Sequence, residues 1–326
     1  MNTNRLFLLL SLSLFTRNIF ANQENLKFNK SESRLEVSGG VNCLWYYNGQ
    51  LMEGVTDNEI LVMADGIYRV EYRDNEGREH SYNFSLDDKT DQPVKIFVIG
   101  DSTASEYDKS RYPRTGWAQV LQSYFNANSV IVEDKALSGR SSKSFFTDEN
   151  GWPVVLPELK KGDFLFIQFG HNDEKPDEKR HTDPYTSYKD YLSVYIDSAR
   201  AHGAFPVLLT SIRRNSWDST KMKIVDTHGD YPAAMRELAI EKNVPLIDLC
   251  SATKQLFESL GDEYTTNQIF MNLPVKTWEN YPEGNSDNTH LQEKGALAIV
   301  KLVIESIQKA DTIPQFKILR ESIQEK

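Results

Sequence analysis

Residues 94–105, with the sequence VKIFVIGDSTAS, decide the class of fold. The apolar and largely β-branched first half is typical of a buried strand in a parallel sheet. The run stops at Gly100, Asp101 and Ser102, where glycine lets the backbone turn sharply. Open α/β sheets bind ligands at the carboxyl ends of their strands, so Ser102 is a candidate nucleophile. Serine also caps helices, and Gly-Asp-Ser alone does not separate the two interpretations.

Strand-like and helix-like segments alternate along the chain from residue 92 to about residue 310. Further strands are predicted at 130–132, 164–169, 205–209 and 244–249. Helices are predicted at 115–125, 185–201, 231–242 and 293–308. Such alternation indicates a parallel sheet that helices cover on both faces. Residues 311–326 follow as a C-terminal tail with weak helical periodicity, which we expect to be partly disordered.

The N-terminal part of the chain has a different pattern. Residues 1–21 are typical of a signal peptide, with Arg5, a short apolar run at 6–15 and Ala21 near a plausible cleavage site. Residues 22–91 contain short strand-like runs separated by Asn-Gly, Asp-Gly and Glu-Gly turns. They predict a small all-β accessory domain similar to an Ig-like sandwich. Trp45 and its tyrosine neighbours are expected to pack in its core, although such aromatics also stack on sugars.

Composition and charge restrict the function. The formal net charge of −10 argues against a nucleic-acid partner, because phosphate binding needs clustered lysine and arginine. After removal of the signal peptide we expect no membrane insertion, and a secreted or periplasmic location. The chain has two cysteines, Cys43 and Cys250, which are expected to be buried thiols rather than metal ligands. The oligomeric state cannot be inferred from these features.

Two residues near the final predicted helix complete a possible catalytic set with Ser102. His290 can act as the base that takes the serine proton, and Asp287 can orient its ring. Their spacing of three residues allows one turn of chain to present both side chains. The developing oxyanion needs N–H donors, which the Ser102 backbone, the Gly139 backbone and the Asn172 amide can supply.

The four stretches GDSTAS, ALSGRSSKSF, GHND and DNTHL, in this order, resemble those of the SGNH (GDSL-like) hydrolases. More specifically, they are similar to the rhamnogalacturonan acetylesterases of carbohydrate esterase family 12. The resemblance covers residues 94 to about 307 and implies a three-layer α/β/α, flavodoxin-like fold without a cofactor. It also implies an enzyme that removes acetyl groups from a plant polysaccharide, most specifically pectic rhamnogalacturonan.

Several assignments stay open at the level of sequence. His171 and Arg140 are candidate substrate-binding residues. His171 could equally be structural, and for Arg140 a solvated or ion-paired role is favoured over a substrate contact. No metal site is predicted, because Asp173 lacks neighbours at ligand spacing. Acetylated xylan or another acetylated sugar is the alternative substrate. A carbohydrate-binding protein on an inactive hydrolase fold is a third possibility, which the complete set of Ser102, Asp287 and His290 disfavours.

Overall fold

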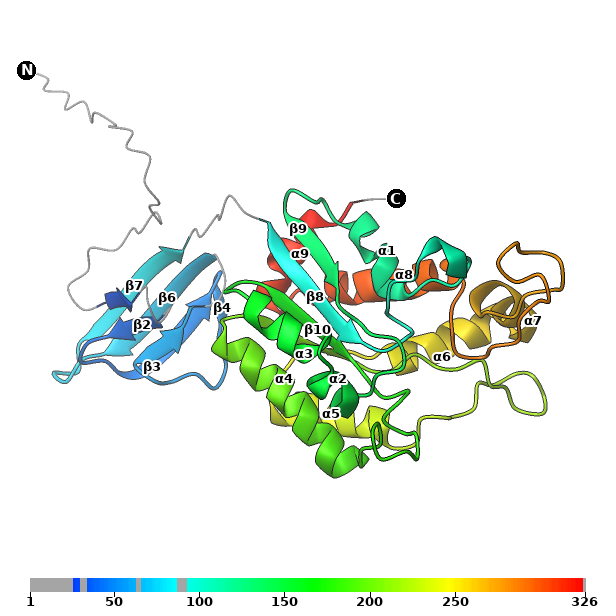
Figure 1. The fold of residues 1–326 in the computed structure, drawn as a ribbon. Coiled ribbons are helices and arrows are strands. Elements are labelled where there is room, and N and C mark those ends of the chain that lie inside the picture. Colours follow the sequence, from blue (N-terminus) through cyan, green and yellow to red (C-terminus); the bar gives the residue numbers. More distant parts are fainter. Residues whose placement is uncertain (1–25, 30–33, 63–65, 87–92, 325–326) are drawn as a thin grey trace, which may run out of the picture. The chain divides into compact units, whose positions relative to one another are not determined.

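The computed structural model describes residues 26–29, 34–62, 66–86 and 93–324 (Figure 1). The chain divides into two compact units, Met1–Asp91 and Gln92–Lys326, and each is described by itself. The predicted signal peptide at 1–21 lies outside the described residues.

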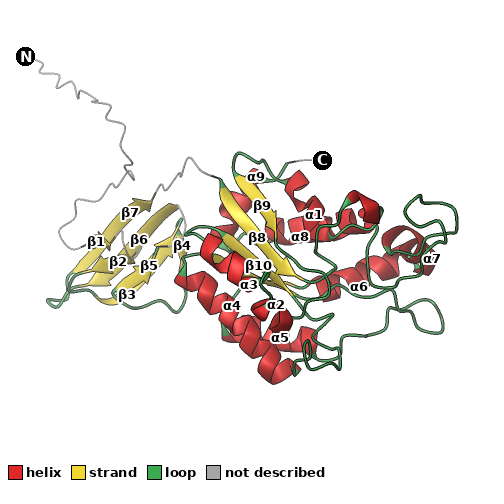
Figure 2. Ribbon diagram, viewed as in Figure 1, coloured by secondary structure: helices red, strands yellow, loops and turns green. Residues whose placement is uncertain are grey.

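The described part of the first unit consists of short antiparallel strands in two sheets (Figure 2). One sheet has the order β1-β2-β5 and the other β4-β3-β6-β7. The strands are β1 (Leu26–Asn29), β2 (Arg34–Val37), β3 (Val41–Tyr47), β4 (Gln50–Leu51), β5 (Glu59–Leu61), β6 (Gly66–Arg73) and β7 (Glu79–Leu86). Alternate residues of β3 and β6 are buried, as period-two patterning predicts. Trp45 is fully buried in this core, and its indole N–H donates to Asp57 O at 2.8 Å.

The second unit is built on a five-stranded parallel sheet of order β12-β11-β10-β8-β9. Its strands are β8 (Val94–Gly100), β9 (Val130–Asp134), β10 (Phe164–Gln168), β11 (Phe205–Leu209) and β12 (Leu246–Ile247). The chain runs outward in both directions from the neighbouring strands β8 and β10, which is the flavodoxin-like order. Gly100 pairs with Gln168, so the two central strands end level with each other. A crevice for a ligand is expected beyond these two strand ends.

Helices cover both faces of this sheet, which confirms the predicted α/β architecture (Figure 1). The helices are α1 (Trp117–Leu121), α2 (Ser142–Thr147), α3 (Trp152–Val155), α4 (Lys189–Ala201), α5 (Tyr231–Glu241), α6 (Leu249–Leu260), α7 (Asp262–Tyr264), α8 (Glu293–Lys309) and α9 (Lys317–Ser322). Ile96 and Val98 face a core with α1, α6, α8 and α9, whereas Phe97 and Ile99 face the core with α2–α5. The apolar residues 96–99 of the predicted strand are therefore buried on both faces of the sheet, as an unbroken apolar run requires.

The C-terminal tail differs from expectation. A 3₁₀ turn at Pro314–Phe316 leads into α9, and Phe316 and Leu319 are buried in the core beside α8. Burial of these two apolar side chains stabilises a segment whose local periodicity is weak.

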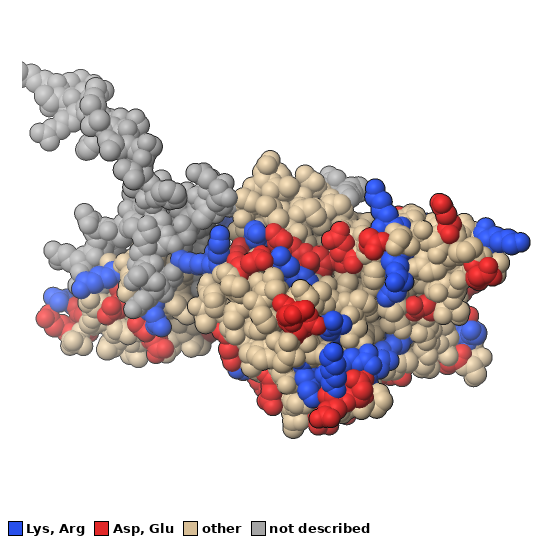
Figure 3. Space-filling model, in the orientation of Figure 1, with Lys and Arg blue, Asp and Glu red and all other residues tan. Residues whose placement is uncertain are grey.

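On the face shown in Figure 3, basic and acidic side chains of the second unit are interspersed. Within the described residues, none of the helices is both long and apolar enough to cross a membrane.

Candidate active site

Ser102 lies two residues beyond the end of β8, in a turn held by buried hydrogen bonds. Asp101 is fully buried, and its Oδ1 accepts from the Thr103 N–H at 2.9 Å and the Thr103 hydroxyl at 2.8 Å. Burial raises the pKa of Asp101, and the Thr103 bonds partly oppose this shift. Gly100 is required at the strand end because a Cβ there would lie 2.8 Å from Gln168 O. This turn fixes the backbone on which the Ser102 hydroxyl is carried.

A second loop brings Asp287 and His290 to the same strand end. Asn272 braces this loop, since its Oδ1 accepts from the Asp287 N–H at 3.2 Å and its Nδ2 donates to Asp287 O at 3.1 Å. Asp287 Oδ1 in turn accepts the N–H groups of Thr289 at 2.8 Å and His290 at 3.0 Å. These bonds hold a carboxylate and an imidazole from one short segment side by side.

The three side chains form one hydrogen-bonded chain. His290 Nε2 lies 2.8 Å from Ser102 Oγ, and His290 Nδ1 lies 2.6 Å from Asp287 Oδ2. An ionised carboxylate only accepts hydrogen bonds, so Nδ1 carries the hydrogen and Nε2 is free to accept the serine proton. Ser102 is largely buried, with 7% of its surface exposed.

The charge of Asp287 is secured by its neighbours. Burial alone raises the pKa of this carboxyl, but the hydrogen bond and charge of His290 outweigh it and lower the pKa to about 2. Asp287 is therefore ionised at any pH near neutrality, as an orienting carboxylate must be.

The oxyanion donors that the sequence predicts lie in loops after neighbouring strands. Gly139 follows β9 and has φ +78°, a left-handed conformation that favours glycine. Among the described residues, the backbone N–H groups of Ser102 and Gly139 donate to no protein acceptor. N–H groups that lack protein acceptors are available to receive a substrate oxygen.

Asn172 follows β10 and is 7% exposed. Its Nδ2 donates one hydrogen to Arg140 O at 3.0 Å, which fixes the amide and leaves its second hydrogen without a described acceptor. The Arg140 backbone therefore positions Asn172, whereas the Arg140 side chain is bonded elsewhere: its Nε donates to Asp148 Oδ2 at 2.6 Å.

His171 is buried, with 3% of its surface exposed. Neither ring nitrogen has a partner within the described part of the chain. Burial lowers the pKa of His171 far below its usual value, and the nearby charges of His228, Arg214 and His290 lower it further. The ring is therefore neutral and packs edge-on against His228 at 4.6 Å between ring centroids.

His228 lies outside the sequence motifs of the site, and its side chain is buried, with 1% exposed. Its Nε2 lies 2.8 Å from Ile212 O and its Nδ1 lies 3.3 Å from Glu174 Oε2. Arg214 bonds Glu174 as well, and Arg213 pairs with Asp226 at 2.6 Å. Ion pairing therefore engages these arginines within the protein.

Sequence reasoning missed two residues near Ser102: Tyr107, which bonds the Ser102 backbone, and Arg114, which bonds Tyr107. The Tyr107 hydroxyl donates to Ser102 O at 2.6 Å, and Arg114 Nη2 donates to the Tyr107 hydroxyl at 3.0 Å. Neither belongs to a chemical motif, and only their proximity in space makes them part of the site. Among the described residues, no group of three or more His, Cys, Asp or Glu side chains is arranged to hold a metal ion.

An α/β/α fold with serine, histidine and aspartate linked at the carboxyl edge of its sheet has the architecture of a serine ester hydrolase. The model of the GDSL-like Lipase/Acylhydrolase family matches residues 98–296, and the chain belongs to this family. The resemblance inferred from the sequence blocks is thereby confirmed.

Curated relatives narrow the comparison. Rhamnogalacturonan acetylesterase RhgT of Bacillus subtilis (strain 168) is 40% identical over 218 residues, which cover 67% of this chain and 91% of the relative. The probable rhamnogalacturonan acetylesterase YesY of the same organism is 36% identical over 66% of this chain and 92% of its own. The crystal structure of YxiM from Bacillus subtilis matches with a TM-score of 0.56 and 24% identity, covering 84% of this chain and 76% of that one. The structural match supports the fold.

Proposed function

We propose that this chain removes acetyl groups from pectic rhamnogalacturonan through an acetyl-Ser102 intermediate. The coarser class is established by its family and relatives: the chain is a carbohydrate acetylesterase, a carboxylic ester hydrolase. The observation that carries the mechanism is the series of hydrogen bonds Ser102–His290–Asp287. The backbone N–H groups of Ser102 and Gly139, which have no acceptor among the described residues, support it. The identity of 40% to RhgT supports the choice of polysaccharide.

The acylation step follows from these positions. Ser102 Oγ attacks the acetyl carbonyl carbon while its proton passes to His290 Nε2. The carbonyl oxygen becomes an oxyanion, for which the N–H groups of Ser102 and Gly139 and the Asn172 amide are the donors. When the tetrahedral intermediate collapses, the C–O bond to the sugar breaks and His290 returns the proton to the sugar oxygen.

Deacylation repeats the sequence with water. His290 removes a proton from water as the water oxygen attacks the acetyl carbon of acetyl-Ser102. Collapse of the second intermediate breaks the bond to Ser102 Oγ, returns the proton to the serine and releases acetate. Asp287 keeps its charge throughout and stabilises the imidazolium in both steps.

The test is acetate release from a panel of acetylated polysaccharides, with p-nitrophenyl acetate as a general acetyl ester. We expect the highest kcat/KM on acetylated rhamnogalacturonan. A higher kcat/KM on acetylated xylan would contradict rhamnogalacturonan as the substrate but would leave the proposed mechanism intact. Binding of polysaccharide without release of acetate from any substrate would favour a non-catalytic carbohydrate-binding protein.

We further propose that residues 1–21 direct the chain to a secreted or periplasmic location and that residues 22–91 form an accessory, Ig-like β-sandwich. The described strands β1–β7, with a core of their own around Trp45, support the second proposal. A protein that begins at Gln92 should fold and cleave p-nitrophenyl acetate within about twofold of the full chain, because the proposed catalytic set lies after this residue. A folded but inactive truncated protein would show that the first unit is needed for catalysis.

A further inference from the structure

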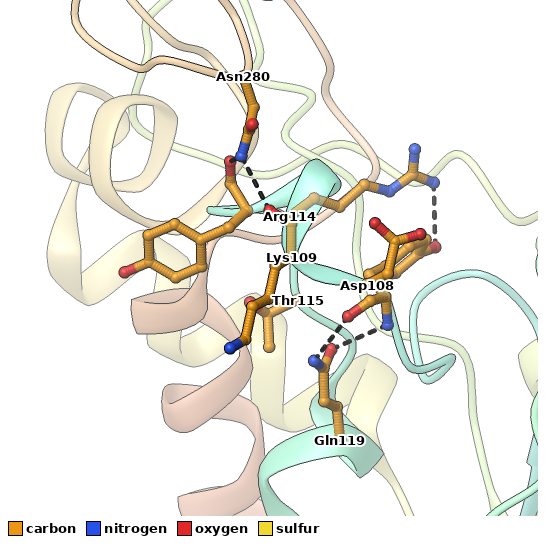
Figure 4. Close-up of a pocket in the computed structure, with 8 residues that line it drawn as sticks. Asp108, Lys109, Arg114, Thr115, Gln119 and Asn280 are labelled. Atoms are coloured by element: carbon orange, nitrogen blue, oxygen red, sulfur yellow. Dashed lines mark hydrogen bonds between the residues drawn. The ribbon is translucent and has the colours of Figure 1, made fainter.

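A cavity of about 290 Å³ lies near the turn that carries Ser102, and the proposed catalytic side chains are not among the residues that line it (Figure 4). Its lining combines aromatic, cationic and amide groups: Tyr107, Asp108, Lys109, Tyr112, Arg114, Thr115, Gln119 and Asn280. At roughly 30 Å³ for each water, it holds the equivalent of about ten water molecules. That volume suits a single sugar residue rather than a long stretch of polysaccharide.

Hydrogen bonds connect this cavity to Ser102. The Arg114 guanidinium carbon lies 4.4 Å from the centroid of the Tyr107 ring, and its Nη2 donates to the Tyr107 hydroxyl at 3.0 Å. That hydroxyl donates to Ser102 O at 2.6 Å. A group bound by Arg114 would therefore lie near the ester that Ser102 attacks, on a neighbouring part of the same substrate.

Arg114 lacks the carboxylate partner that other arginines of this site region possess. Arg140, Arg213 and Arg214 are each paired with an aspartate or glutamate. In contrast, no carboxylate of the described residues lies within ion-pair distance of Arg114, and its buried Nε has no hydrogen-bond acceptor. A partly buried guanidinium without an anion is suited to take one from a ligand, because it can bind a carboxylate through two N–H groups.

The other charged groups of the cavity do not satisfy Arg114. Asp108 is engaged at the start of a short 3₁₀ turn, where its Oδ1 accepts from the Ser110 N–H at 2.8 Å and from the Ser110 hydroxyl. Lys109 adds a second cation, and its side chain extends in a different direction from the Arg114 guanidinium (Figure 4). Two cations and one anion leave the lining with a positive balance, although the whole chain carries −10.

We infer that Arg114 binds the carboxylate of a uronate residue that neighbours the acetylated sugar in the substrate. The inference rests on the proposed function and adds to it a residue that selects acidic polysaccharide over neutral polysaccharide. Tyr112, which is 44% exposed and lines the same cavity, offers an aromatic surface for the sugar ring.

The test compares one acetylated rhamnogalacturonan oligosaccharide in two forms, with free uronate carboxylates and with the same carboxylates methyl-esterified. Wild-type protein should have a kcat/KM about 10-fold higher on the free acid, the size expected for one charge-assisted contact. Arg114→Gln should reduce this ratio to about 1. Arg114→Lys should keep part of it, because lysine retains the charge but not the paired N–H groups.

Two controls separate charge recognition from a structural effect. Arg111→Gln removes an exposed arginine of the same loop, outside the cavity lining, and should leave the ratio at its wild-type value. The wild-type ratio itself should fall as sodium chloride is raised, since salt screens a partly exposed pair. This salt measurement needs no variant and so does not depend on the folding of Arg114→Gln.

The outcomes are distinct. A wild-type ratio of about 1, or an unchanged ratio in a folded Arg114→Gln protein, overturns the role of Arg114. Acetate release from the oligosaccharides in the same experiment would still support the proposed function. Cleavage of p-nitrophenyl acetate without acetate release from either oligosaccharide overturns the rhamnogalacturonan proposal and the Arg114 proposal together.

Discussion

The site proposed around Ser102 has two sides, one for proton transfer and one for oxyanion binding. On the first, His290 and Asp287 are linked to Ser102 by side-chain hydrogen bonds, whereas on the second two of the three proposed donors are backbone N–H groups. The first side depends on a loop far along the sequence, which Asn272 braces. The second side depends on loops that directly follow strands β8 and β9, and on Asn172 after β10. The comparison implies that proton transfer is concentrated in a few side chains, while oxyanion binding is shared between the backbone and one amide.

The largest effect should come from Ser102→Ala, which removes the atom that both sides serve. We expect kcat for an acetyl ester to fall on the order of 10⁶-fold, the loss seen when a triad nucleophile is removed. Steady-state hydrolysis of p-nitrophenyl acetate measures it, with circular dichroism to establish that the variant is folded. Retention of a tenth of the wild-type kcat by a folded variant would remove Ser102 from the mechanism.

Asp287→Asn tests the side-chain half of the comparison. An amide in place of the carboxylate no longer holds His290 in the required tautomer. Such a change typically lowers kcat by about 10⁴-fold. Asn272→Ala, which leaves the carboxylate but removes the brace on its backbone, should cost less. A loss of less than 10-fold for Asp287→Asn would mean that Asp287 does not orient the base.

Asn172→Ala tests the oxyanion half. The amide should bond weakly to the ground-state carbonyl and strongly to the oxyanion, so kcat should fall by roughly 10²–10³ with a smaller change in KM. Asn150→Ala, an exposed asparagine in the loop beyond α2, serves as the matched control and should be neutral. A change confined to KM would reassign Asn172 to substrate binding.

The smallest of these effects concerns stability and pH. The pKa of Asp287 is lowered from 3.8 to about 2 in the folded protein, so its contribution to stability is present above pH 3.8 and lost as pH falls toward 2. The difference between the ordinary pKa of Asp287 and its pKa in the folded protein corresponds to about 2 kcal/mol of unfolding free energy. Urea denaturation at pH 6, 4 and 3 should show the gap between wild type and Asp287→Asn narrowing with acid. A gap that is constant from pH 6 to 3 would contradict the bond between Asp287 and His290.

The strand at 94–100 and the residues of the site could be proposed from sequence because local patterns report them. An unbroken apolar run ending in glycine indicates a buried strand and a turn, whichever residues surround it. The strand predicted at 244–249 is too long: in the structure the strand spans only Leu246–Ile247, and α6 already begins at Leu249. A short apolar run does not by itself distinguish a strand from the start of a helix, and Asp248 caps this one.

The remaining features depend on contacts between residues distant in sequence. Burial of His228 results from its bonds with Ile212 and Glu174, and the position of Arg114 from its contact with Tyr107. Phe316 and Leu319 order the C-terminal segment by packing against the core. No local periodicity reports such contacts, so a histidine or arginine outside a motif cannot be placed until the fold is known.

The most direct test of the central claim is to trap the acetyl-enzyme. The protein is mixed with p-nitrophenyl acetate, quenched with acid during turnover, digested and examined by mass spectrometry. We predict one acetyl group on the peptide that contains Ser102, absent after the substrate is exhausted and absent in Ser102→Ala. Acetylation at another residue during turnover, or rapid turnover by wild type with persistent absence of label at Ser102, would contradict the account.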